Sequence, residues 1–359
     1  MNENSISFSE LPEETQKMFL GLLCKHEEAR NTYGVVGSPI SVVFGGVRLV
    51  PVGNQFVQFD PHKTYLDFLS YFMKSIIGTD WGNVELKKPH NDQHQIIKLY
   101  KKVADQQKNQ VKSEGRIYSL NRTGALNAWY QLAYDLHVLS HNLALNEDVL
   151  NKLKHKDQYQ GARYELSVAA IMIRAGFEVK HKDGKGGSTS LFEFTAKDKK
   201  TGEIIAVEAK SKHRAGVLDF DLENGKVDHG KINVKYLLGD ALTKATRYPL
   251  VIFTDLNMPP IDVELQNSSW TKELERTISN KEKQYKTGMP ATAFIFTNHP
   301  HHYEDDTIPN PLSSCMITRT SNPRFPINNE EIIDKIAATL KQYENIPSFF
   351  DDQEKPPVM

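Results

Sequence analysis

The stretch LFEFTAKDKKTGEIIAVEAK, residues 191–210, joins two apolar runs through a polar segment. LFEFTA and EIIAVEAK are rich in β-branched and aromatic residues, and KDKKTG between them has the composition of a turn. We therefore predict two antiparallel strands that form a hairpin. Because successive side chains of a strand point to opposite faces, Glu208 and Lys210 are expected on one face of the second strand.

The length of the turn predicts which residues face each other across the hairpin. A four-residue loop at 199–202 places Glu193 opposite Glu208, counting outward along both strands. Two like charges at opposed positions of apolar strands are destabilising. Lys210 can neutralise one of them, and a hard divalent cation held by both carboxylates can neutralise both. This pattern predicts metal-assisted hydrolysis, in which the lysine orients or deprotonates the attacking water.

The flanking sequence predicts an α/β domain around this hairpin. QYQGARYELSVAAIMIRAG has the apolar spacing of an amphipathic helix that ends at a glycine, and FEVKH follows as a strand. The predicted elements are, in order, a helix over 158–176, a strand over 177–181, the hairpin, a helix over 233–247, a strand over 249–255, a helix near 269–286 and a strand over 291–299. The predicted order is therefore α-β-β-β-α-β with one αβ unit added.

At these residues the chain resembles the PD-(D/E)XK nuclease superfamily, the fold of many restriction endonucleases. The resemblance rests on the glutamate of GARYEL, the acid of LFEFTA, the segment VEAK and the element order over 158–255. It implies a restriction-endonuclease-like αβββαβ core and a nuclease that depends on Mg²⁺ or Mn²⁺, with DNA as the expected partner and endonucleolytic cleavage as the expected activity. The first strand acid of that superfamily is usually Asp, whereas here it is Glu193.

The resemblance also implies a role for each matching residue. Glu193 and Glu208 would ligate the metal, together with the backbone carbonyl of Ala209. Lys210 would serve the attacking water. Glu165, from the preceding helix, would assist a metal or a water.

The distribution of charge supports a local nucleic-acid surface. The chain has 44 Lys and Arg against 45 Asp and Glu, a net charge of −1, which excludes a uniformly basic coat. Residues 152–247, however, hold 19 Lys and Arg against 13 Asp and Glu, a net charge of +6. Phosphate contacts come from such local basic charge, and Lys212, Arg214 and Lys244 are the candidates. A solvated surface side chain is the alternative for each, and for Lys244 a lysine whose stem lies along apolar surface.

Residues 1–150 are predicted to be mainly helical, with a small β-hairpin at Gly45-Gly46. Their aromatic side chains could stack bases, although aromatics at helical spacing are more often core. Substrate recognition, self-association into a homo-oligomer and sensing of a partner all stay open for this region. The remaining boundaries are a nuclease-like domain over 151–345 and a disordered tail over 346–359.

The sequence favours a cytoplasmic protein with no membrane partner. The first residues are acidic and polar, without the pattern of a leader, and no apolar segment approaches the length of a membrane span. The two cysteines, Cys24 and Cys315, offer neither a disulfide framework nor a cysteine-based zinc site.

Three other interpretations of these patterns stay open. In the first, Glu193, Glu208 and Lys210 are solvated residues on an edge hairpin. In the second, the same fold is a catalytically silent module that binds nucleic acid or a partner, since one fold supports many functions. In the third, the chain is an interaction protein with no nucleic-acid role. The histidine-rich segment 298–306 matches no metal-binding template and is interpreted as a polar turn after a strand.

Overall fold

The computed structural model describes residues 5–33, 39–108, 120–181, 192–214, 217, 232–244, 246–258, 269–299, 302 and 314–353. Within these residues the chain is a mixed α/β protein with two sheets. The second half contains α7 (Tyr159–Arg174), β5 (Phe177–His181), β6 (Phe194–Asp198), β7 (Ile204–Ser211), α8 (Lys235–Ala241), β8 (Leu250–Asp255), α9 (Ser269–Gln284), β9 (Ala291–Asn298), β10 (Ser314–Arg319) and α10 (Glu331–Lys341). The predicted order α-β-β-β-α-β, with an added αβ unit, is found from α7 to β9. The helix after the hairpin is shorter than predicted.

Six strands form the larger sheet, in the order β10-β9-β8-β7-β6-β5. β5, β6 and β7 are antiparallel neighbours, whereas β7, β8 and β9 run parallel. β10 pairs antiparallel with β9 and forms an edge that the sequence pattern did not predict. A parallel connection needs a crossover, and here α8 and α9 supply it.

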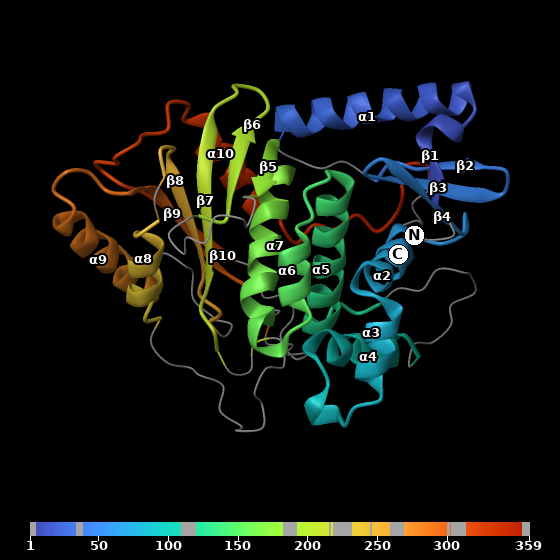
Figure 1. Cartoon of the computed structure of the whole chain (residues 1–359), viewed down its shortest axis with the longest axis horizontal. Helices are drawn as coiled ribbons and strands as arrows, with labels where there is room; N and C mark the ends of the chain where they lie inside the picture. The colour runs from blue at the N-terminus through green and yellow to red at the C-terminus, as the bar shows by residue number, and fades with distance from the viewer. Residues whose placement is uncertain are drawn as a thin grey trace.

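Helices cover both faces of this sheet, as Figure 1 shows. Along β7, Ile205 and Val207 pack in the cluster that contains α7, whereas Ala206 packs in the cluster that contains α8 and α9. This alternation is the period of two expected of a strand that is buried on both faces. Glu208 and Lys210 continue the parity of Ala206, so they face the α8 side.

The register predicted for the hairpin is confirmed over its paired residues. Phe194 pairs with Val207 and Lys197 with Ile204, and the N–H of Asp198 donates to the carbonyl of Glu203 at 2.8 Å. The paired ladder ends one residue before the predicted contact.

Glu193 lies just outside β6 and stays beside β7. Its N–H donates to the carbonyl of Val207 at 3.1 Å, a bond one residue out of step with the ladder. Continuing the register by one residue would place Glu193 opposite Glu208. The two residues do not form a regular strand pair, because the hydrogen bond of Glu193 is shifted by one residue.

The first half forms a smaller sheet in the order β1-β4-β3-β2 with helices beside it. Its elements are β1 (Ser5–Ser7), α1 (Glu13–Tyr33), β2 (Val42–Phe44), β3 (Val47–Val52), β4 (Gln55–Phe59), α2 (Tyr65–Ile77), α3 (Thr79–Leu86), α4 (Gln95–Lys108), α5 (Gly124–His141) and α6 (Glu147–Leu153), with short 3-10 turns at Phe8–Glu10, His90–Asp92 and Lys156–Gln158. The hairpin at Gly45 and Gly46 is confirmed, and both glycines have positive φ, as a two-residue turn requires.

The aromatic residues of this half are mostly core. Tyr65, Phe68, Phe72, Trp129 and Tyr130 are all buried, which leaves these rings no surface on which to stack bases. The cluster that contains them continues through α5 and α7 to the large sheet, so one apolar core joins the first half to the second. The domain boundary expected near residue 150 stays a prediction.

Part of the segment expected to be a disordered tail is packed on the fold. Residues 346–353 are described, and Phe350 is 2% exposed, packed edge-on against Tyr65 and Phe68. Asp352 makes an ion pair with the buried Arg48. The ring of Phe350 is buried by contacts with residues far away in sequence, which only the folded chain provides. Residues 354–359 lie outside the described residues.

None of the described helices is long and apolar enough to cross a lipid bilayer.

Candidate functional site

The chain topology places the candidate acids together at one end of the large sheet. This is the end at which the parallel strands β7, β8 and β9 have their carboxyl ends, and we call it the carboxyl edge. Glu208 lies near the carboxyl end of β7, and β6 runs antiparallel to β7, so Glu193 at the start of β6 reaches the same edge. The chain reverses at Gly176 between α7 and β5. As a result, the first half of α7, which carries Glu165, lies at this edge too.

Glu208 is buried at this edge between two ammonium groups. Its side chain is 0% exposed, and its Oε1 lies 3.0 Å from Nζ of Lys210 and 3.5 Å from Nζ of Lys244. Lys210 reaches a second carboxylate, with its Nζ 2.7 Å from Oδ2 of Asp240 on α8. The four charges alternate in sign along a path from the interior to the surface, where Asp240 is 59% exposed.

Burial and charge set the protonation of these groups. Burial raises the pKa of Glu208, Lys210 opposes that shift, and the charge of Glu193 adds to it. Burial alone would lower the pKa of Lys210, but the charge of Glu208 and the hydrogen bond to Asp240 outweigh burial and raise it. Lys210 is therefore held as an ammonium ion, which donates hydrogen bonds and does not take up a proton.

Glu165 belongs electrostatically to the same group. Burial, followed by the charge of Glu193, raises the pKa of Glu165 to about 8, and Glu208 adds to the shift. Lys152 on α6 opposes it from 4.0 Å. The carboxyl groups of all three predicted acids thus influence one another, although Glu165 is on α7, Glu208 is on β7 and Glu193 precedes β6.

The residues present suit a divalent cation in composition and charge. Oε2 of Glu208 is buried and has no hydrogen-bond partner among the described residues. Glu165 holds a proton at neutral pH because burial, and then the charge of Glu193, raise its pKa to about 8. Hard cations prefer carboxylate and carbonyl oxygen, and the backbone carbonyl of Ala209 follows Glu208 directly. In the arrangement seen, however, no three His, Cys, Asp or Glu side chains of the described chain converge as metal ligands would.

Two of the predicted phosphate-binding residues are placed differently from the expectation. Arg214 is 3% exposed, and its guanidinium donates to the backbone carbonyls of Leu256 at 3.0 Å and Ile232 at 3.3 Å. It therefore holds the segment after β7 in place, and its phosphate contact stays a prediction. Lys244 is 9% exposed, so it is not the surface lysine of the alternative interpretation, and its ammonium faces Glu208. Lys212 is half-buried beside the carboxyl edge and stays a candidate.

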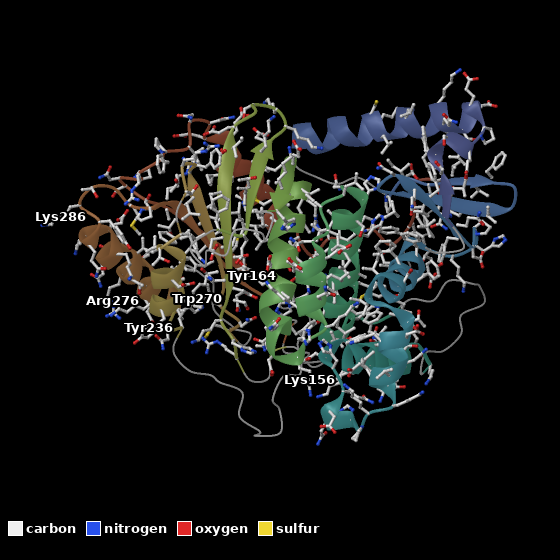
Figure 2. All side chains as sticks on the ribbon, viewed as in Figure 1. Lys156, Tyr164, Tyr236, Trp270, Arg276 and Lys286 are labelled. Atoms are coloured by element: carbon white, nitrogen blue, oxygen red, sulfur yellow. The ribbon has the colours of Figure 1, made fainter. Side chains whose placement is uncertain are left out.

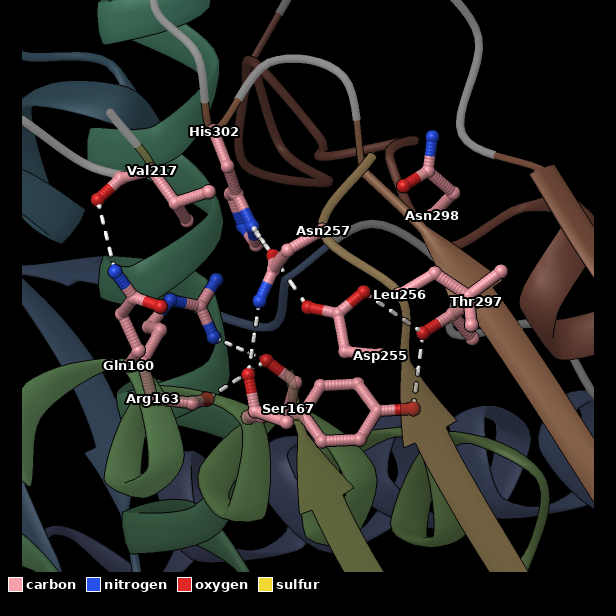
Figure 3. Close-up of polar contacts among 12 residues, drawn as sticks. Gln160, Arg163, Ser167, Val217, Asp255, Leu256, Asn257, Thr297, Asn298 and His302 are labelled. Carbon is pink, nitrogen blue, oxygen red and sulfur yellow. Dashed lines mark hydrogen bonds and ion pairs between the residues drawn. The ribbon is translucent and has the colours of Figure 1, made fainter. Parts of the chain in front are cut away.

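A second buried polar cluster lies at the same edge, on the face covered by α7 (Figure 3). Asp255 at the end of β8 is 1% exposed and accepts a hydrogen bond from Oγ1 of Thr297 at 3.2 Å. Thr297 shares a hydrogen bond of 2.9 Å with the hydroxyl of Tyr164, and Nδ1 of His302 lies 3.9 Å from Oδ2 of Asp255. Burial raises the pKa of Asp255 to about 7. The carboxyl edge therefore has polar residues on both faces of the sheet.

Sequence reasoning missed Asp240, Lys152 and Asp255. Asp240 has a weak signal, because it stands four residues before Lys244 in a helical pattern and so shares its face. Asp255 also has a signal, because it ends a buried strand. Nothing in the sequence placed Lys152 near Glu165.

Comparison with models of protein families, with curated proteins and with solved structures finds no match for this chain. The function of the site is therefore inferred from its own residues.

Proposed function

We propose that the chain is a divalent-metal-dependent nuclease with a restriction-endonuclease-like αβββαβ core, and that DNA is its substrate. One observation carries the proposal. The fully buried Glu208 and the ammonium of Lys210 lie 3.0 Å apart at a strand end, and the carboxyl groups of Glu193 and Glu165 interact electrostatically with Glu208 there. Burying a carboxylate and a lysine together is costly unless each is compensated, and a structural ion pair alone would need no further acids.

The residues of the chain have distinct parts in this proposal. Glu193, Glu208 and the carbonyl of Ala209 would hold Mg²⁺ or Mn²⁺. The bound cation would supply positive charge to a phosphodiester and activate a water molecule. Lys210, kept charged by Glu208 and Asp240, donates hydrogen bonds to the water or to a phosphate oxygen.

Cleavage of circular nucleic acids tests the proposal. Purified protein is incubated with circular duplex DNA, circular single-stranded DNA and RNA, in Mg²⁺ or Mn²⁺ and in EDTA. Lys210→Ala should abolish cutting. Lys200→Ala is the matched control, because Lys200 lies in the turn of the same hairpin, is 58% exposed and, among the described residues, forms its ion pair with Glu331, which is exposed as well.

Metal-dependent cutting that survives in Lys210→Ala would contradict the assignment of the site. No cutting of circles or of linear ends under any condition would favour a catalytically silent module on the same fold. The neutralisation of Glu208 by two lysines is the observation that favours that second function. Such a module should bind nucleic acid in EDTA and keep its affinity in Glu208→Gln.

A further inference from the structure

The outer face of α8 presents an exposed aromatic ring beside the candidate site. Tyr236 is 81% exposed, the largest exposure among the large hydrophobic side chains of the described residues. Figure 2 shows it at the outer surface of α8. It stands four residues before Asp240, so the two side chains are neighbours on one helical face. Asp240 contacts Lys210 at 2.7 Å, which links this face directly to the buried carboxylate.

Two lysines lie on or close to this helix. Lys235 is exposed and adjacent to it on α8. Nζ of Lys281, from α9, lies 3.7 Å from the position that a Cβ would occupy on Gly239. Because Gly239 has no side chain, the ammonium of Lys281 lies close to the backbone of α8, three residues after Tyr236.

An exposed ring with lysines on its own helix and on the neighbouring one is the composition of a surface for unpaired nucleotides. Bases of a single strand stack on aromatic side chains, and nearby lysines contact the phosphates between them. In a duplex the bases are already stacked on each other, so a lone surface ring gains nothing from them. Against the residues that the structure describes, the ring has little packing that would explain a tyrosine at this position, since it is 81% exposed.

We infer that the outer face of α8 binds an unpaired nucleic-acid strand, with Tyr236 stacking on a base and Lys235 and Lys281 contacting phosphates. This inference rests on the proposed nuclease function and refines its substrate class to single-stranded or locally unpaired nucleic acid. The bound strand would pass Asp240 and bring a phosphodiester to Lys210.

Binding in EDTA tests the inference without cleavage. Fluorescence anisotropy is measured for a labelled 20-nucleotide thymidine strand and for a duplex of the same length. Tyr236→Ala should weaken binding of the single strand about tenfold, the usual effect of losing one stacked base, and change binding of the duplex less than about twofold. Tyr236→Trp should retain the affinity. Lys235→Ala should weaken binding and reduce its salt dependence.

Val84→Ala and Lys108→Ala are matched controls. Val84 is 59% exposed on α3 and Lys108 is 76% exposed on α4, both outside the large sheet and its covering helices. Neither substitution should change binding.

Several results would overturn the inference. They are absence of single-strand binding by the wild type, unchanged binding in Tyr236→Ala, and equal losses for single strand and duplex. Cleavage assays distinguish failure of the inferred single-strand surface on α8 from failure of the proposed nuclease function. Tyr236-dependent binding without any metal-dependent cutting supports the surface and refutes the nuclease, whereas metal-dependent cutting that Tyr236→Ala leaves unchanged supports the nuclease and refutes the surface.

Discussion

Asp255→Asn should remove a large part of the pH dependence of stability. Asp255 is 1% exposed, and burial raises the pKa of its carboxyl from 3.8 to about 7. In the unfolded chain the group loses its proton near its ordinary pKa, while the folded chain keeps the proton up to about pH 7. The unfolded state therefore binds fewer protons between these values, and stability falls as pH rises through this window.

The size of the effect follows from the shift in pKa. Each unit of differential pKa corresponds to about 1.4 kcal/mol, so a shift of roughly 3 units gives a loss of about 4 kcal/mol between pH 4 and pH 8. Asn resembles the protonated acid in shape, and its amide oxygen can still accept the hydrogen bond from Thr297. The variant should match the wild type near pH 4 and be more stable above pH 7.

Urea unfolding followed by tryptophan fluorescence measures this difference. The free energy of unfolding is determined for both proteins at intervals from pH 4 to pH 8 at constant ionic strength, with equal m-values required. Asp240→Asn is the control, because the hydrogen bond from Lys210 lowers the pKa of Asp240 and its contribution has the opposite sign. A difference between wild type and Asp255→Asn that stays constant, or that moves in favour of the wild type as pH rises, would refute the reasoning.

Three further predictions concern the site and the core. Glu208→Ala should lower the free energy of unfolding in urea by about 3 kcal/mol or more, because it leaves two ammonium groups facing a buried gap. Glu208→Gln should lower it less. Equal stability of the Ala variant and the wild type would contradict this. Mg²⁺ or Mn²⁺ should raise the thermal unfolding midpoint more at pH 8.5 than at pH 6. The reason is that Glu165, with a pKa of about 8, must lose its proton to accommodate a cation. A larger shift of the midpoint at pH 6, or no shift in either buffer, would count against a cation site. Asp135→Ala should lower the free energy of unfolding by about 3–5 kcal/mol, because Arg163, 2.8 Å away and 2% exposed, loses its buried counter-charge. A loss below about 1 kcal/mol in denaturant titration would show that the pair is not buried in solution.

The Glu208 prediction bears on how activity is tested. Apolar packing alone would let a carboxylate on a strand face be removed without unfolding the chain. The burial of Glu208 beneath Lys210 and Lys244 shows that its charge is part of the interior. A test of activity therefore needs the isosteric Gln variant in addition to the truncated one.

Local rules were sufficient for the order of the elements from α7 to β9 and for the register of the hairpin, but not for β10 and α10. Strand alternation and a four-residue turn predicted that Glu193 and Glu208 approach each other, because both depend on neighbours in sequence. The same rules located Gly176 as a helix end and the two-residue turn at Gly45 and Gly46. These features need only backbone geometry.

What the sequence by itself determined is thus the order of elements and the face on which Glu208 and Lys210 lie. Only the tertiary structure decided which charges surround them. Lys244 and Asp240 reach the strand because α8 packs over that face, Arg214 is buried because its segment folds under β8, and Phe350 is core because α2 lies beneath it. The physical reason is that burial and charge pairing depend on contacts between residues distant in sequence, and no local pattern records those contacts.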